Sequence, residues 1–553
     1  MKHLTLTLLL LAASSCSKEE RVWGYSPVTE EADADTGQTP SMTEGGLTLP
    51  PGSLSGSITA ECELPEEAND VLNQLSMLVG AEENIRSCEE AVEAKSYVGC
   101  DFWPTITMNR VDQDLFQFHV VVANTGEEPA DVSISFAETE VTQAKVAANS
   151  IQEFALPWVP ALKGGSYSCS LGLGDTTRLS LLEPMGAYHL QSSRPVVAYQ
   201  FSPLHFYNDE APPKDNFGYD CNASYTNDAS LLLPVQAWGT SYRAAGYSQA
   251  LLEGEELSIT AQKDGTTVKV YANAAIAAGE TIPGIAEGRK QDYELNRGDV
   301  LRLTPEEKRI SGSLIQADQP IQVISSSPCE RVPQDLAACD HLEEVVPPAE
   351  SLGRRYIVTP PTGPTGRPIK YALQFTGNED DTEFYYRGDA PSELPKKMDA
   401  GDFEFFPSLD ETFEVIASHS FSLTIFLRGG ERQRDENTDP SQSIAIPIEQ
   451  FRKKYIFLAP EDYKSIYADI IAPVGTTISL DGDELTTTRE EISCSEYEGL
   501  RVLLRGNDGI HRIEASAPIG VQVVAHALYT SFMFPGGLNV TEIAPAPRAP
   551  TVR

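Results

Sequence analysis

The sequence predicts an all-β protein built from tandem antiparallel β-sandwich domains, immunoglobulin-like or jelly-roll-like, preceded by a short helical segment that contains cysteines. Three observations predict this fold class. Apolar and polar residues alternate with a period of two, turns rich in Gly, Asp and Asn separate these runs, and the same elements recur in the same order about every 100 residues. A propeller is the rival architecture, but its blades need only about 40–50 residues. We therefore expect a row of sandwiches.

The composition supports packed domains and excludes some classes of partner. The 553 residues include 81 acidic and 41 basic side chains, which gives a formal charge of −40, and 41% of the residues are hydrophobic. Such a charge repels phosphate backbones and anionic lipid headgroups. The sequence therefore predicts no nucleic-acid partner and no membrane contact apart from an N-terminal anchor.

The N-terminus has the pattern of a secretory signal. Lys2 and His3 precede an apolar run too short to span a bilayer, and Ala13-Ser14-Ser15-Cys16 resembles a bacterial lipobox, in which the cysteine is acylated. We assign 1–15 to the lipoprotein signal peptide, Cys16 to the lipid anchor and 16–60 to a disordered tether. The expected location is the bacterial outer membrane, at its cell-surface or periplasmic face. Ordinary signal cleavage, with Cys16 incidental, is the alternative.

The first repeated element is an opening motif: a proline, a large apolar residue four positions later, and a tyrosine that begins a strand. Copies start at Pro234, Pro348 and Pro447, and a degenerate copy ends at Tyr97. Proline is preset for the first turn of a helix, and the apolar residue can cover the edge of a core. The motif therefore predicts a single helical turn before each domain.

Three further elements follow the opening motif. Two alternating strands around a polar turn, which we interpret as a hairpin, occur at 118–135, 257–272, 371–386 and 467–482. A Gly-containing turn into a strand occurs at 295–304, 398–407 and 497–506. The last element is a pair of strand runs broken by a polar corner, whose equivalent positions are Pro195, Pro320, Ser420 and Pro518.

These repeats divide the chain into domains. We expect a helical, Cys-containing cap at 61–96 and a C-terminal tail at 547–553, with four sandwiches between them at 97–210, 211–343, 344–440 and 441–546. Within the cap, 66–78 places its apolar residues on one helical face. We expect this helix to pack on the first domain.

The cysteines suggest disulfides. Without Cys16, eight cysteines remain, an even number in an exported chain. Cys329 and Cys339 flank a proline-containing loop and are the best local pair. Cys88 with Cys100, or either of them with Cys62, is a weaker alternative. The chain has no CxxC and no zinc-spaced His/Cys cluster, so the sequence predicts neither a metal site nor a cofactor.

Catalytic motifs are missing: there is no nucleophile elbow, P-loop, HExxH helix or dinucleotide-binding motif. We assign no catalytic residue and expect no enzyme. His341, within Cys339-Asp340-His341-Leu342-Glu343-Glu344, has the most suggestive neighbours, but we interpret this stretch as a disulfide-pinned domain junction. Other motifs receive structural interpretations: the histidines His119, His419 and His526, the acidic turns 378–381 and 435–439, and the Arg-Gly-Asp triplets 297–299 and 387–389.

Part of the chain resembles a known family. The stretches LLLPVQAWGTSY, ITAQKDGTTVKV, LNRGDVLRLT, SGSLIQADQPIQVISSSPC and ACDHLEEVVPPAESLGRRYIVTPP, between Ser230 and about Pro361, are similar to the IgGFc-binding protein N-terminal domain family. Weaker likeness extends from 95–104 to near Pro545. The resemblance implies an exported bacterial lipoprotein of a myxobacteria-like organism. The family name suggests an immunoglobulin G Fc partner but transfers no binding residues, so the ligand-binding residues are unknown.

These observations predict a non-enzymatic, lipid-anchored cell-surface adhesion protein. Its tandem sandwiches would recognise a protein or glycan at a cell surface or in a matrix. The alternative is a structural spacer or assembly subunit of an envelope complex. An extracellular polysaccharide hydrolase is the less favoured third hypothesis.

Overall fold

The computed structural model describes residues 62–550, apart from 76–84, 166, 169–171, 174–178, 213–220, 251, 308, 337, 431–437, 461–462, 507–508 and 528–529. The chain divides into two units, Met1–Ser57 and Ile58–Arg553. Only the second unit contains described residues, and all that follows concerns it. The proposed signal 1–15, the anchor Cys16 and the whole tether 16–60 therefore lie outside the described residues.

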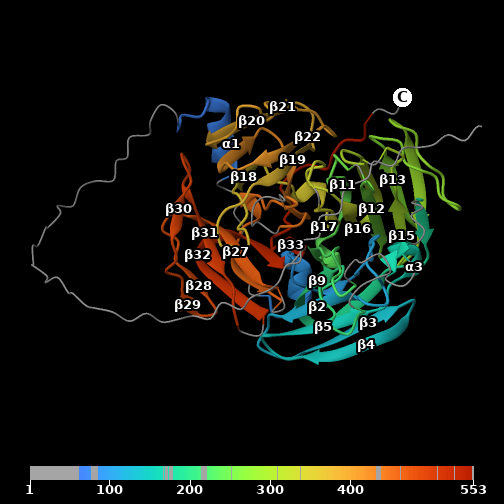
Figure 1. Ribbon diagram of the computed structural model, residues 1–553. Coiled ribbons are helices and arrows are strands. Elements are labelled where there is room, and N and C mark those ends of the chain that lie inside the picture. The colour runs from blue at the N-terminus through green and yellow to red at the C-terminus, as the bar shows by residue number, and fades with distance from the viewer. Residues whose placement is uncertain are drawn as a thin grey trace, which may run out of the picture. The chain divides into compact units, whose positions relative to one another are not determined.

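The described chain is all-β, as the sequence predicts, and its first sandwich shows the plan (Figure 1). A long bent strand, β9 (Tyr188–Phe201), belongs to two antiparallel sheets. Its first half pairs with β1 (Gly99–Phe102) and β3 (Ala130–Phe136), and its second half pairs with β2 (Phe118–Asn124) and β10 (Ala229–Leu231). The outer strands β4 (Thr139–Val146) and β5 (Ser150–Leu156) complete two sheets of four strands each.

The same plan recurs three times. Sandwich 2 consists of β11 (Gly239–Arg243), β12 (Glu256–Ala261), β13 (Thr266–Tyr271), β14 (Lys290–Leu295), β15 (Val300–Leu303), the long strand β16 (Leu314–Glu330) and β17 (Asp340–Val345). Sandwich 3 consists of β18 (Arg355–Val358), β19 (Tyr371–Gly377), β20 (Thr382–Gly388), β21 (Lys397–Met398), β22 (Phe403–Leu409), β23 (Phe413–Ala417), β24 (Phe421–Leu427) and β25 (Ser441–Ile444). Its long strand is split at the corner into β23 and β24.

Sandwich 4 consists of β26 (Arg452–Leu458), β27 (Ser465–Pro473), β28 (Ile478–Leu480), β29 (Asp483–Glu484), β30 (Arg489–Glu491), β31 (Tyr497–Leu503), the long strand β32 (Ile510–Ala527) and β33 (Thr530–Pro535). An insertion after β5 holds α3 (Pro160–Lys163), β6 (Tyr167–Ser168), β7 (Gly172–Leu173) and β8 (Leu181–Glu183). β8 pairs with β15, so the insertion extends a sheet of sandwich 2. The exact domain boundaries given above stay predictions.

The expected hairpins are wrong. β2 and β3 each pair with a different half of β9, and the corresponding strands of the other sandwiches pair with their own long strands in the same way. The polar turn between them therefore carries the chain from one sheet to the other. Alternation with a period of two reports which face of a strand is buried, and it does not report which strand lies alongside.

The opening motifs form the expected single helical turns. These 3-10 turns are η2 (Val235–Ala237), η3 (Ala349–Ser351) and η4 (Ile448–Gln450), each directly after its proline. The large apolar residue four positions after the proline is buried in all three: Trp238, Leu352 and Phe451.

The tyrosine of the motif ties the opening strand to the corner of the long strand. The Tyr356 hydroxyl donates to the carbonyl of Phe421 at 2.7 Å and accepts from the Gly353 N–H at 3.3 Å. Tyr242 and Tyr455 make the same two bonds in sandwiches 2 and 4. In sandwich 1 the residue in this register is Phe102, so the degenerate copy does not end at Tyr97 as expected.

Successive sandwiches interlock through glycines. A Cβ added at Gly353 would lie 2.2 Å from the Cβ of Pro447, the next opening proline. Gly239 meets Pro348 and Gly99 meets Pro234 in the same way, at 2.6 and 2.4 Å. Real Cβ atoms do not approach so closely, so each contact requires a glycine.

The four sandwiches form a closed ring, so the expected row is wrong. The closing strands β10, β17, β25 and β33 contact one another in a cycle that includes β10 with β33, and Figure 1 shows β17 and β33 with the sandwiches around them. After β33 the chain returns to the first sandwich: the Tyr97 N–H donates to the Leu538 carbonyl and the Val540 N–H to the Lys95 carbonyl. Arg452 takes the glycine position in sandwich 4, and its guanidinium lies 5.3 Å from the centre of the Tyr97 ring.

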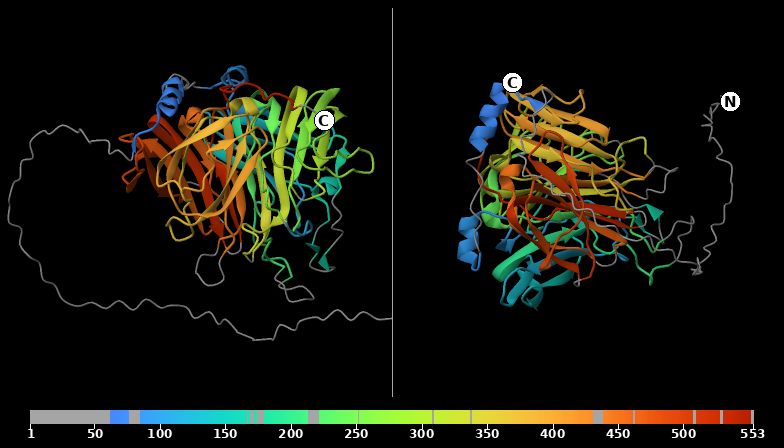
Figure 2. Two further views of the ribbon diagram at one scale, coloured as in Figure 1. Left: turned by 90° about the horizontal axis from the view of Figure 1, so that it is seen from above. Right: turned by 90° about the vertical axis from the view of Figure 1, so that its left-hand side faces the viewer.

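The cap contains α1 (Glu66–Leu75) and α2 (Cys88–Ala94), visible as the two blue helices in Figure 2. The first confirms the expected helix as far as it is described, but its packing was wrongly predicted. Val71 and Leu75 contact Ile416 of β23 in sandwich 3, not the first domain. A disulfide between Cys62 and Cys494 holds the start of this helix to sandwich 4, a link that sequence proximity could not indicate.

Candidate functional site

The described disulfides include the pairs that the sequence favours. Cys329 is bonded to Cys339, and Cys88 to Cys100. The alternative that places Cys62 with either of the latter is wrong, because Cys62 is bonded to Cys494. Of the other two, Cys221 is disulfide-bonded and Cys169 lies outside the described residues. Such bonds are typical of exported proteins.

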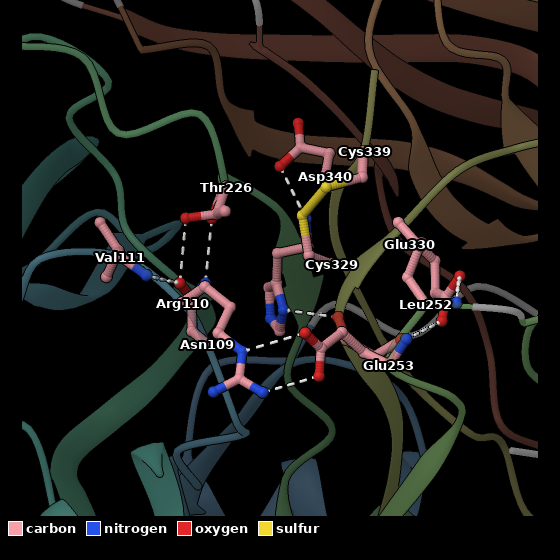
Figure 3. Close-up of a disulfide and its surroundings, with 12 residues drawn as sticks. Asn109, Arg110, Val111, Thr226, Leu252, Glu253, Cys329, Glu330, Cys339 and Asp340 are labelled. Atoms are coloured by element: carbon pink, nitrogen blue, oxygen red, sulfur yellow. Dashed lines mark hydrogen bonds and ion pairs between the residues drawn. A yellow bond between two sulfur atoms is a disulfide. The ribbon is translucent and has the colours of Figure 1, made fainter. Parts of the chain in front are cut away.

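The Cys329–Cys339 bond joins the end of β16 to the start of β17 (Figure 3). Next to it, the Glu330 carboxylate accepts the backbone N–H groups of Leu252 and Gly254, at 3.1 and 2.6 Å. Glu253 between them forms a two-pronged ion pair with Arg110 of sandwich 1, at 2.6 and 3.3 Å. The disulfide loop is thereby fixed to both sandwiches 1 and 2.

His341 lies inside this junction and is fully buried. Its Nδ1 is 2.9 Å from the Ser327 carbonyl, and its Nε2 is 3.2 Å from the Thr107 hydroxyl and 3.4 Å from Glu343. Glu343 in turn accepts from the Gln200 amide at 2.8 Å. The cluster joins strands of two sandwiches, and its neighbour Cys339 is already bonded to Cys329, so these contacts support the interpretation as a domain junction.

Asp228 lies at the centre of the ring. Its carboxylate accepts the backbone N–H of Glu343 in β17 at 2.9 Å, and in β25 the N–H of Gln442 and the hydroxyl of Ser441, at 3.2 and 2.8 Å. One side chain therefore holds three closing strands together. Burial raises the pKa of Asp228 well above its usual value, although these donors act in the opposite direction.

Two more buried aspartates begin the neighbouring closing segments. Asp340 and Asp439 lie eight residues before Pro348 and Pro447, so they occupy equivalent positions. Within the described chain, the Oδ2 atom of Asp340 and the Oδ1 atom of Asp439 have no hydrogen-bond partner. Burial raises the pKa of both carboxyls well above the usual value, and for Asp340 the charges of Asp439 and Asp228 raise it further. Burial therefore favours the protonated form of both carboxyls.

Sequence reasoning missed Asp228, and it considered Asp439 only as part of the acidic turn 435–439. The signal was present for Asp439, because an aspartate at one fixed distance before two opening prolines is part of the repeat. Burial raises the pKa of Glu344 in the same way, and its partner is the Ser443 hydroxyl at 2.9 Å. Among the described residues, no group of three His, Cys, Asp or Glu side chains has an arrangement suited to a metal ion.

The remaining histidines make structural contacts. His526 is buried, and its Nε2 is 2.8 Å from the Thr362 carbonyl. Burial lowers its pKa to about 4, so it is neutral and donates this bond. His119 stacks edge-on against His205, and Nδ1 of His419 is 3.1 Å from the Ser418 hydroxyl.

The acidic turn 378–381 fastens the corner of sandwich 3. Glu379 accepts both the backbone N–H and the hydroxyl of Ser420, at 3.1 and 2.7 Å. Asp381 is hydrogen-bonded to Lys397, which lowers the pKa of Asp381. Of the second turn, 435–437 lies outside the described residues, and Asp439 belongs to the ring centre.

The two Arg-Gly-Asp triplets are also engaged in the fold. The Arg297 guanidinium lies 5.2 Å from the centre of the Trp103 ring, and Asp299 is buried and accepts the Met185 N–H at 3.0 Å. Arg387 lies within 3.9 Å of Glu414 and 3.6 Å of Glu496. Both arginines therefore hold neighbouring sandwiches together.

One end of the ring, which we call the loop face, is the end at which the long strands stop and the closing strands begin. The connections between them are 202–228, 331–339, 428–440 and 528–529, of which 213–220, 337, 431–437 and 528–529 lie outside the described residues. The exposed large apolar side chains at this end include Tyr207 at 53% and Leu252, beside Glu330, at 39%. Loops of unequal length on a repeated scaffold are common binding elements.

A groove of about 300 Å³ lies at the seam between sandwiches 4 and 1. Its lining includes four basic side chains from four separate segments: Arg86, Arg194, Lys454 and Arg512. Sequence reasoning missed them, and their scattered positions leave no pattern that could have revealed the groove. We call it the seam groove.

The fold and these sites define an all-β, disulfide-bonded repeat protein, and none of its described helices is long and apolar enough to cross a membrane. The family described as IgGFc binding protein matches residues 228–525, more than half of the chain, so the chain belongs to this family. The match begins at Asp228 and omits nearly all of sandwich 1, although that sandwich has the same strand plan.

Other comparisons add little. No curated protein matches the chain. Among solved structures, an anti-sigma factor domain-containing protein from Clostridium clariflavum is 9% identical, covering 76% of this chain and 98% of its own, with a TM-score of 0.11. A marsupial T cell receptor is 8% identical, covering 52% and 99%, with a TM-score of 0.07. Scores this low carry no argument about fold or function.

Proposed function

We propose that this protein is a non-enzymatic, lipid-anchored cell-surface adhesion protein that binds a protein or glycan partner through the loop face of its ring. The family match supports a binding-type domain. The observation that carries the proposal is the closed, interlocked ring, which holds the loops of four sandwiches at one end. A rigid scaffold reduces the ordering cost that loops pay when they bind.

The titratable clusters support the non-enzymatic part of the proposal. The His341 cluster and the central aspartates are buried and engaged between sandwiches. Their contacts explain why these residue types occur where they do, without a substrate. The family name makes immunoglobulin G Fc the first partner to test.

The experiment is a binding panel with the purified full-length protein. The probes are immunoglobulin G Fc, mucin, extracellular polysaccharides and bacterial envelopes, each with wild type, Tyr207→Ala and the control Val474→Ala. Val474 is also exposed, at 63%, but lies in the turn between β27 and β28. We expect saturable binding to one probe class, weakened about tenfold by Tyr207→Ala and unchanged by Val474→Ala.

Two outcomes would contradict the proposal. Saturable binding that Tyr207→Ala and a Leu252→Ala variant both leave unchanged would exclude the loop face. If none of the probes binds, and crosslinking on intact cells finds one stoichiometric partner, the alternative function as a structural spacer of an envelope complex is favoured instead.

A further inference from the structure

At the seam groove, a position that is bonded in sandwiches 1 and 3 has no side-chain hydrogen bond or ion pair among the described residues. Lys454 precedes the corner-binding tyrosine of sandwich 4 by one residue. The residue in the same register is Asp101 in sandwich 1 and Arg355 in sandwich 3. Asp101 bonds His189 at 3.0 Å, and Arg355 bonds Glu414 and Glu496, each at 2.6 Å.

At the seam between sandwiches 1 and 2 the space is smaller. The pocket beside Asp101, lined by Trp103, His189 and Arg297, measures only about 50 Å³. The seam groove is about six times larger, and Lys454 is exposed within it, with no hydrogen bond or ion pair among the described residues. A volume of about 300 Å³ is at the lower end of the range for small-ligand sites and has room for one or two sugar units.

The charges in the groove favour an anion. Arg194 is paired with Glu128, and the Arg512 side chain donates to Asn149, which carries no charge. Arg86 and Lys454 are exposed, and neither side chain is paired in the described structure. Two lining carboxylates, Glu127 and Glu514, have no partner among the described residues and offset part of the charge of Arg86, Lys454 and Arg512. The groove therefore has an excess of positive charge in a chain of net charge −40.

The same lining also offers hydrogen-bond acceptors. The carboxylates of Glu127 and Glu514 and the amide of Asn149 can accept from hydroxyl groups. A ligand that satisfies both the basic side chains and these acceptors carries one negative group and several hydroxyls. An acidic peptide supplies the negative group but not the hydroxyls.

From this lining we propose that the seam groove binds an anionic sugar unit, that is, a saccharide residue bearing a carboxylate or a sulfate. Arg86, Lys454 and Arg512 contact the anionic group, and the carboxylates of Glu127 and Glu514 accept from the ring hydroxyls. The site is separate from the loop face, and it goes beyond the adhesive function proposed above.

The test is calorimetric titration of the full-length protein at low salt with four probes. Sialyllactose carries a carboxylate, a heparin-derived disaccharide carries sulfates, lactose is neutral, and an acidic hexapeptide has charge without a sugar. We expect one or both anionic saccharides to bind, lactose and the peptide not to bind, and affinity to fall as salt is added. The comparison of the first two probes identifies the anionic group.

The variants are Lys454→Gln and Arg86→Gln, with Lys269→Gln as the matched control. Lys269 is an exposed strand lysine in β13, far along the chain from the groove. Both groove substitutions affect exposed side chains, so the fold should be retained, which circular dichroism checks. We expect each to weaken saccharide binding about tenfold and the control to leave it unchanged.

The proposal is overturned if neither anionic saccharide binds, if lactose binds equally well, or if both groove variants bind like wild type. Binding of the hexapeptide alone would show that the groove accepts a different class of ligand. Tyr207→Ala separates this result from the loop-face proposal, because it should leave saccharide binding in the groove unchanged whatever it does to partner capture.

Discussion

At the scale of single residues, the buried aspartates at the ring centre make stability depend on pH. Burial raises the pKa of Asp340 in the folded protein, so the folded state keeps a proton that the unfolded chain releases. Its contribution to the free energy of unfolding is therefore complete below the unfolded pKa of about 4 and is lost as the pH rises towards the folded pKa. Asp439 acts in the same direction.

Asp340→Asn tests this linkage. The amide has the shape of the protonated carboxyl but cannot ionise, so the loss of stability between pH 5 and pH 9 should be smaller by about 1–3 kcal/mol. Urea unfolding at pH 5, 7 and 9 measures it. Asp483→Asn is the control, because Asp483 is exposed in β29. An unchanged pH dependence in Asp340→Asn would contradict the assignment of a proton to this group.

Tyr356→Phe tests the bond between the opening strand and the corner. It removes a hydroxyl that serves a buried N–H and a buried carbonyl, so we expect the free energy of unfolding to fall by about 1–3 kcal/mol. Tyr385→Phe, whose hydroxyl bonds the exposed Glu383, should cost much less. Equal effects of the two variants in chemical denaturation would show that the bridge to the corner adds little.

At the scale of elements, a glycine at or just before the opening strand of sandwiches 1, 2 and 3 sets the distance to the next sandwich. Gly353→Ala places a Cβ against Pro447, whose ring cannot move aside as a flexible side chain could. We expect a loss of about 1–3 kcal/mol from overpacking, measured by thermal unfolding. Gly499→Ala is the matched control within a strand, because its nearest atoms would be 3.9 Å away. A control that is as unstable as Gly353→Ala would refute the interlock.

The elements also show how far the sequence could predict this structure. The strands, the opening turns and the polar corners follow from local patterns, because burial of one strand face and the fixed φ of proline are local properties. The crossing of the chain from one sheet to the other at each polar turn does not follow from local patterns, since a polar turn joins paired and unpaired strands equally well. The groove residues could not be found either, because Arg86, Arg194, Lys454 and Arg512 meet only when the first and fourth sandwiches do.

At the scale of the whole molecule, the Cys62–Cys494 bond joins residues 432 positions apart and fastens the cap to sandwich 4. Replacing both cysteines by serine should lower the free energy of unfolding by about 2–5 kcal/mol and release α1 from Ile416. Hydrogen exchange of 66–75 measures the release. Cys88→Ser with Cys100→Ser, which opens a link of 12 residues, should leave exchange in α1 unchanged. Protected α1 amides in the first double variant would show that packing alone holds the cap.

The meeting of β10 with β33 also constrains how such a protein can evolve. An open array of repeats can gain or lose a unit by unequal recombination, because each new unit still finds a neighbour on either side. Here an added or deleted sandwich would change the angle through which each unit turns, and the final strand would no longer reach the first. The copy number is therefore locked at four. Variation is left to the connections at the loop face, which already range from the two residues 528–529 to the whole of 202–228.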